Sequence, residues 1–191
     1  MLFTAILICF HSLTATDSFA GCVAGDCENG HGTYITESGN RYAGNWVNGQ
    51  TQGRDIFTWA NGDQYVGDFV GDKFSGRDTL TRIDGTTYEG DWVNDKKSGQ
   101  GTLIWPDGSK YVGAFMDGRM NGRGTLTKSD GSTYEGEWVN DKMSGRGTFT
   151  WPDGRTFVGD FVDNEMMEGG TLTKPDESQP PKPAENQNVA P

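Results

Sequence analysis

The chain has 191 residues, of which 29 are glycine and only 33% are apolar, a smaller apolar share than a single globular core of this length normally contains. Its formal net charge is −11 and no basic cluster stands out. This balance argues against nucleic-acid binding and against simple electrostatic attraction to anionic lipid.

Residues 1–20 have the pattern of a secretory signal peptide. A short apolar segment, Leu2–Phe10, precedes the small-x-small sequence Ser18–Ala20. The segment is too short to span a bilayer, so we predict a mature chain that is secreted or periplasmic. Residues 19–22 also loosely resemble a lipidation site, which leaves anchoring through Cys22 as an alternative.

Residues 21–29 are predicted to form a cysteine-containing cap before the repeats. Cys22 and Cys27 remain after Cys9 leaves with the signal peptide, and in an exported chain we expect them to form a disulfide. A metal half-site is the alternative. We expect no metal, because His31 is the only histidine of the mature chain and zinc requires four ligands.

From residue 30 to residue 174 the chain repeats itself every 23 residues, with six complete units and a terminal half-repeat. A constant period over this length indicates a repeat array. The repeated pattern is aromatic-x-Gly-x-aromatic, with further aromatic residues before the turns. The candidate binding or packing face consists of Tyr42, Trp46, Trp59, Tyr65, Phe69, Tyr88, Trp92, Trp105, Tyr111, Phe115, Tyr134, Trp138, Trp151, Phe157 and Phe161.

Each unit is predicted to be a β-hairpin. The segment Trp105–Ser109 contains Pro-Asp-Gly, which favours a type I turn with a G1 bulge in a three-residue loop. Leu103 should then face Tyr111, and Asp117 falls in a linker between hairpins. Because side chains alternate along a strand, nearly all recurring residues share one face, which we expect to be buried. Glycine weakens a strand interior, so we expect Gly113 and its equivalents to leave a notch for a ring of the neighbouring hairpin.

The predicted fold class is therefore all-β: an elongated single-layer antiparallel ribbon of six 23-residue β-hairpin repeats plus a terminal half-repeat. The half-repeat, Gly170–Lys174, should pair with the sixth hairpin and leave its other edge open. Residues 175–191 are rich in proline and cannot bury a core, so they are predicted to be a disordered tail.

Two irregularities interrupt the period. Asp55 and Asp78 stand where the other units have glycine. The tryptophans also alternate between the two strands of successive hairpins, from Trp46 and Trp59 through to Trp138 and Trp151. This alternation has two interpretations, which are volume compensation in a packed layer and an aromatic track along an open groove.

The segment Tyr134–Thr148 closely resembles the MORN (membrane occupation and recognition nexus) repeat, and the resemblance covers about residues 30–174. The pair Cys22 and Cys27 ahead of the first unit also resembles exported bacterial members. The resemblance implies elongated ribbons of hairpins that serve as scaffolds, dimerisation modules or membrane-proximal adaptors.

No set of nucleophile and base is evident along the chain, so we predict that it is not an enzyme and binds no cofactor. The predicted function is a non-enzymatic exported repeat scaffold for protein–protein interaction or self-association. The alternative is binding of carbohydrate or another cell-envelope component through the aromatic track, and the third is association with membrane lipid, which the net charge of −11 does not favour.

Overall fold

The computed structural model describes residues 20–174, and all regular structure in this part of the chain is β-strand. The predicted signal peptide, apart from Ala20, and the predicted tail at 175–191 lie outside these residues. The strands are β1 (Gly21–Gly25), β2 (His31–Ile35), β3 (Arg41–Val47), β4 (Gln50–Thr58), β5 (Gln64–Val70), β6 (Lys73–Thr81), β7 (Thr87–Val93), β8 (Lys96–Ile104), β9 (Lys110–Met116), β10 (Arg119–Thr127), β11 (Thr133–Val139), β12 (Lys142–Thr150), β13 (Thr156–Val162), β14 (Glu165–Met166) and β15 (Thr171–Thr173).

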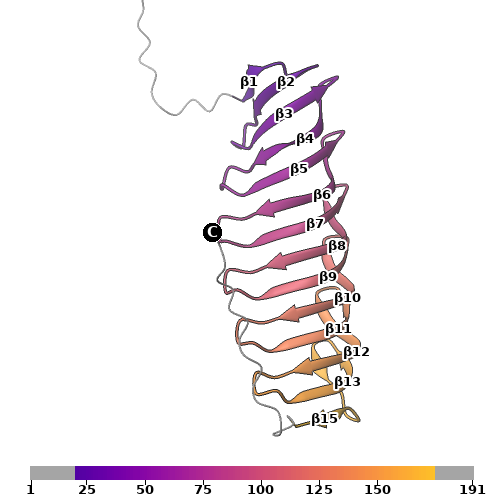
Figure 1. Ribbon diagram of the computed structural model, residues 1–191. Coiled ribbons are helices and arrows are strands. Elements are labelled where there is room, and N and C mark those ends of the chain that lie inside the picture. Colours follow the sequence, from indigo (N-terminus) through magenta and orange to yellow (C-terminus); the bar gives the residue numbers. More distant parts are fainter. Residues whose placement is uncertain (1–19, 175–191) are drawn as a thin grey trace, which may run out of the picture.

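These strands form one open antiparallel sheet whose order follows the sequence from β1 to β14, with β15 also paired to β13. Figure 1 shows the strands as the rungs of a long, narrow ladder, with β1 at one end and β15 at the other. The predicted elongated ribbon of hairpins is thus confirmed. The sheet is continuous because each strand from β2 to β13 pairs with the strand before it and the strand after it, and not only within its own hairpin.

The predicted three-residue loops are confirmed. In the fourth hairpin Leu103 is paired with Tyr111, and the amide of Trp105 donates to the carbonyl of Ser109 at 2.9 Å. Gly108 closes the loop with φ = +85°, the left-handed conformation that a G1 bulge requires.

The predicted linkers between hairpins are wrong, because they are hairpin turns themselves. Asp117 and Gly118 connect β9 to β10 with φ values of +50° and +87°. Two successive residues with positive φ are characteristic of a type I′ turn, which joins adjacent antiparallel strands directly. Asp117 also pairs with Lys96 at 2.8 Å across the surface.

A bulge recurs where each seven-residue strand pairs with the nine-residue strand that follows it. Between β7 and β8, Gly90 is paired with Gly101 and Asp91 with Ser98, so two residues of β8 have no partner on β7. Gln100, one of those two, donates its amide to the Asp91 carboxylate at 2.9 Å. Bulges bend a strand and increase its twist, so this repeated defect curves the sheet once per unit.

The C-terminal half-repeat pairs as predicted, with Leu172 of β15 opposite Phe157 of β13. Together β14 and β15 occupy the place of one nine-residue strand that is interrupted. In units four to six the first glycine of the Gly-x-Gly sequence, Gly99, Gly122 or Gly145, has a positive φ. Here Glu168 occupies that position, and Gly169 has φ = +91° instead. The described residues provide no strand on the outer side of β15.

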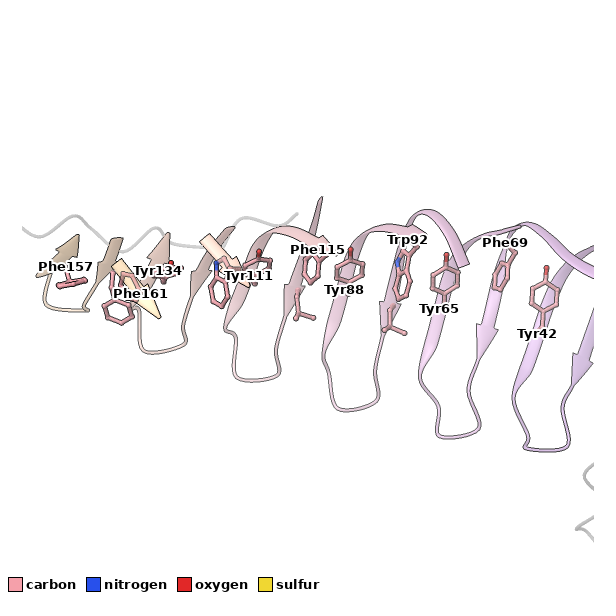
Figure 2. Packing of buried hydrophobic residues seen from close by; sticks show 14 of the residues in the cluster. Tyr42, Tyr65, Phe69, Tyr88, Trp92, Tyr111, Phe115, Tyr134, Phe157 and Phe161 are labelled. Atoms are coloured by element: carbon pink, nitrogen blue, oxygen red, sulfur yellow. The ribbon is translucent and has the colours of Figure 1, made fainter. Parts of the chain in front are cut away.

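The core is a continuous ladder of rings packed edge to face. Tyr111 contacts Phe115 of its own strand at a centroid distance of 5.3 Å and Trp138 of the next unit at 5.2 Å, with interplanar angles of 90° and 82°. The same zigzag runs from Trp46 to Phe157, and Figure 2 shows the labelled rings in single file along the array. Such pairs stabilise by about 0.5–1.5 kcal/mol each beyond the burial of their area.

We expected Gly113 to be covered by a ring of the neighbouring hairpin, but it is covered by a ring of its own strand. Tyr111 bends along its own strand over Gly113, and it also reaches Gly124 of the next hairpin, so only the second glycine receives a ring from a neighbouring hairpin. The cause is a hydrogen bond, since the Tyr111 hydroxyl donates to the carbonyl of Ala114 at 3.0 Å. This bond draws the ring along the strand, across the glycine two residues further on.

Candidate functional site

The aromatic face divides into a buried interior and a partly exposed border. Trp46, Trp92 and Trp138 are 9%, 6% and 3% exposed and belong to the ring ladder. The tyrosines, Phe69, Phe115, Phe157 and Phe161 are buried with them. By contrast, Trp59, Trp105 and Trp151 lie next to the three-residue loops and are only partly buried. Packing thus accounts for the first three tryptophans, while the other three remain accessible to a ligand.

An apolar hollow on this face lies between the loop that follows β8 and strand β12. It has a volume of about 800 Å³. We define the apolar groove by Trp105, Met120, Leu126, Lys128, Trp138 and Met143, which line it. Its floor is Trp138 of the buried ladder and one of its walls is the partly exposed Trp105. Because the floor belongs to a rigid core, the groove exists without a ligand, as binding sites usually do.

Basic side chains lie among the rings of this face, although the chain is acidic overall. The Lys128 ammonium is 5.6 Å from the centre of the Phe149 ring, and the Arg155 guanidinium is 5.2 Å from that of Trp151. The Lys97 ammonium lies 4.7 Å from the centre of the Tyr88 ring. Burial, with a smaller effect of nearby Arg82, lowers the pKa of Lys97 to about 8. The face therefore combines aromatic area with local positive charge, a combination favourable to cation–π contacts and to acidic groups on a ligand.

Asp55 and Asp78 were noted in the sequence only as departures from glycine, and the structure gives them a role. Asp78 is 1% exposed and accepts hydrogen bonds from the Tyr65 hydroxyl at 2.7 Å and from Arg54 at 3.2 Å. Asp55 accepts the Tyr42 hydroxyl at 2.7 Å in the same way. Each carboxylate fills the space over a glycine of a neighbouring strand, where a Cβ on Gly67 would overlap Asp78.

The ladder tryptophan of the unit that contains Asp78 differs from its equivalents. In two units the indole of the ladder tryptophan donates to a glycine carbonyl, from Trp46 to Gly32 at 3.4 Å and from Trp138 to Gly124 at 3.2 Å. Asp78 occupies the equivalent position in the third unit, and there the Trp92 indole nitrogen is buried without a partner among residues 20–174. Both aspartates act in packing and hydrogen bonding, away from the apolar groove.

The N-terminal cap has the predicted disulfide between Cys22 and Cys27, with their Cα atoms 5.9 Å apart. It lies at the opposite end of the array from the apolar groove. In the described part of the chain, no group of three or more histidine, cysteine, aspartate or glutamate residues could hold a metal ion. Within residues 20–174 no helix is long and apolar enough to cross a membrane.

Comparison with known proteins assigns the repeats. The family model described as "MORN repeat" matches residues 25–41, 42–64, 65–87, 88–110, 111–133 and 134–154, which together cover more than half of the chain. No curated protein matches the sequence. Among solved structures, the chain is similar to the SAS-4 (dCPAP) TCP domain in complex with a proline-rich motif of Ana2 (dSTIL) from Drosophila melanogaster. The identity is 11% and the TM-score 0.48, over 87% of this chain and 96% of the other.

Proposed function

The chain belongs to the MORN repeat family, whose repeats generally mediate protein and membrane interactions, and we propose that this member is an exported, non-enzymatic scaffold for protein–protein interaction or self-association. The observation that carries the proposal is the apolar groove of about 800 Å³ with its partly exposed tryptophan wall. Tryptophan is enriched among the residues that contribute most to protein interfaces.

Export is supported by two features. The first is the apolar N-terminal segment with its small-x-small site, which precedes the described residues. The second is the disulfide between Cys22 and Cys27, which is compatible with an extracellular location because such bonds persist in oxidising compartments. Secretion and retention in a periplasm both satisfy these features. Anchoring through a lipid on Cys22 does not, because the Cys22 sulfur is in the disulfide.

Replacing Trp105 by alanine should abolish partner binding and leave the fold intact. The purified chain is immobilised, and its partner is captured from the cell-envelope fraction of the source cells. We expect the wild-type chain to retain a protein that Trp105→Ala binds at least about tenfold more weakly, since truncation of a hot-spot residue costs about 2 kcal/mol or more and tryptophan is enriched among such residues. Because Trp105 is only partly buried, the variant should melt within a few degrees of the wild type.

The matched control is Trp59→Ala, which removes the same side chain two units earlier, outside the apolar groove. Equal retention by the wild type and Trp105→Ala would contradict the proposed use of the groove.

A glycan of the cell envelope is the second candidate ligand. It is favoured by the regular spacing of the partly exposed Trp59, Trp105 and Trp151, which are two units or roughly 19 Å apart at ~4.8 Å per strand. Purified envelope polysaccharide, added to this chain without any partner protein, should then quench its tryptophan emission. Lipid vesicles form the third arm of the same titration.

Self-association is expected at the open edge of β15 when residues 175–191 are removed. An unpaired strand edge invites addition of another strand, and the proline-rich segment that follows β15 is suited to block it because proline donates no backbone hydrogen bond. The truncated chain should therefore scatter light as a dimer or larger assembly, and Leu172→Pro in that chain should restore the monomer. A truncated chain that stays monomeric at high concentration would show that the edge is only a cap.

A further inference from the structure

We propose that the apolar groove binds a proline-rich peptide, and that its occupant in this protein is the chain's own segment 175–191. The inference rests on the proposed function in one respect only, since it takes the same groove to be the docking site. It adds the chemical class of the ligand and a form of self-regulation. The segment contains Pro175, Pro180, Pro181, Pro183 and Pro191.

The point at which this segment leaves the sheet places it on the same border of the sheet as the loop side of the groove. Thr173 is paired with Thr156 at the end of β13 that adjoins the loop containing Trp151. Trp105, Lys128 and Trp151 occupy the same position in three successive units, 23 residues apart. Lys174 lies 23 residues after Trp151, so it occupies this position in the terminal half-repeat. The segment therefore starts at the loop-side border of the aromatic face, at the end of the ladder occupied by β15 (Figure 1).

The reach of the segment matches the position of the groove. Strands are ~4.8 Å apart, so each unit of two strands advances ~9.6 Å, and Lys174 is roughly 29 Å from Trp105, three units away. A polyproline II helix rises ~3.1 Å per residue. Pro180 would then lie roughly 19 Å and Pro183 roughly 28 Å from Lys174. These distances correspond to Lys128 and Trp105, two of the residues that border the groove on the loop side.

The pitch of such a helix also matches the repeat. One turn of polyproline II contains about three residues and advances ~9.3 Å, close to the ~9.6 Å of one unit. Pro180 and Pro183 are three residues apart in Pro-Pro-Lys-Pro, so both would present the same edge to successive units. A ligand with another pitch, such as a β-strand, would lose this register after one unit.

The chemistry of the two surfaces is complementary. Proline rings pack well on aromatic side chains, and a polyproline II segment binds at low entropic cost because it is already extended. Asp176 and Glu177 follow Pro175 and would lie near Arg155, whose guanidinium covers Trp151 and pairs with Asp153 at 2.7 Å. The acidic residues thus meet one of the few basic positions of the aromatic face.

The test uses a fluorescently labelled peptide with the sequence of residues 175–191, titrated with the full chain and followed by anisotropy. A variant of the full chain carries alanine at Pro180, Pro181 and Pro183, so that its own segment no longer competes. We expect this variant to bind the peptide about tenfold more tightly than the wild-type chain, because a tethered segment competes at an effective concentration in the millimolar range.

Two further substitutions in that variant locate the site. Trp105→Ala should reduce peptide binding at least tenfold. Trp59→Ala should not change it, because Trp59 is five units or roughly 48 Å from Lys174 and outside the apolar groove. A peptide in which the three prolines are replaced by alanine should bind none of the chains.

The proposal is overturned if the alanine variant binds the peptide no better than the wild type, or if Trp105→Ala leaves binding unchanged. Either result is distinguishable from failure of the proposed function. A partner that is retained by the wild type and lost with Trp105→Ala would show that the groove binds protein even when the chain's own segment does not occupy it. If the wild-type chain retains no partner and the alanine variant binds no peptide, the groove is not a binding site.

Discussion

Raising the pH above 10 should unfold this protein steeply. Burial raises the pKa of Tyr42, Tyr65, Tyr88, Tyr111 and Tyr134, to about 12 for Tyr111, and the hydrogen bonds to Asp55 and Asp78 raise the first two further. In the unfolded chain these hydroxyls ionise near pH 10. Since the folded-state pKa values are raised, their stabilisation is fully present below pH 10 and is lost as the pH rises from 10 toward the folded values.

The size of the effect follows from the number of protons released. Each tyrosine that ionises on unfolding lowers the free energy of unfolding by about 1.4 kcal/mol per pH unit, so five of them lower it by about 7 kcal/mol per pH unit. A stability of about 5–15 kcal/mol is then exhausted within roughly two pH units. Circular dichroism and tyrosinate absorbance, recorded from pH 8 to pH 12, should change together in one transition.

Tyr111→Phe provides the control, because Phe157 occupies the equivalent position in the sixth unit and is also buried. The variant loses the hydrogen bond to Ala114 and should be less stable at pH 8, yet its stability should fall less steeply with pH, by about 1.4 kcal/mol per unit. Ionisation of the tyrosines well before the loss of structure would contradict the ladder as the source of the transition.

Replacing Gly113 by valine should destabilise the array by about 1–3 kcal/mol or more. A Cβ at this position would lie 2.5 Å from the Cα of Gly124, 2.6 Å from the Tyr111 hydroxyl oxygen and 2.7 Å from the carbonyl oxygen of Arg123. Two of these three atoms belong to the backbone of the paired strand, so the strain cannot be relieved by a side-chain rotation alone. Thermal unfolding followed by circular dichroism measures the effect.

Val112→Ile is the matched control, since Val112 is the adjacent residue, points to the other face and is 45% exposed. It should change stability by less than about 0.5 kcal/mol. If Asp117 lay in a linker, as predicted, Asp117→Ala would be nearly neutral and could serve as the control. It cannot serve, because Asp117 has φ = +50° in a turn and pairs with Lys96. Equal melting temperatures for Gly113→Val and Val112→Ile would refute the close packing of the glycine pairs.

The sequence alone determined the local architecture. The 23-residue period, the Pro-Asp-Gly loops and the alternation of apolar residues predicted the hairpins, the pairing of Leu103 with Tyr111 and the half-repeat that ends at β15. These features depend on residues close in the chain, because turn chemistry and side-chain alternation act over a few positions. The cysteine pair was predictable because Cys22 and Cys27 are the two cysteines left after the predicted signal peptide, and five positions separate them.

The tertiary structure decided what lies between units. The turn at Asp117 and the continuous sheet depend on pairing of one hairpin with the next, and the position of the Tyr111 ring depends on the carbonyl of Ala114 at the bulge. The sequence pattern assigned all six tryptophans to one face and could not separate the buried Trp138 from the partly exposed Trp105. That distinction arises because Trp138 lies inside the ring ladder between Tyr111 and Tyr134, whereas Trp105 lies at its border, beside a loop.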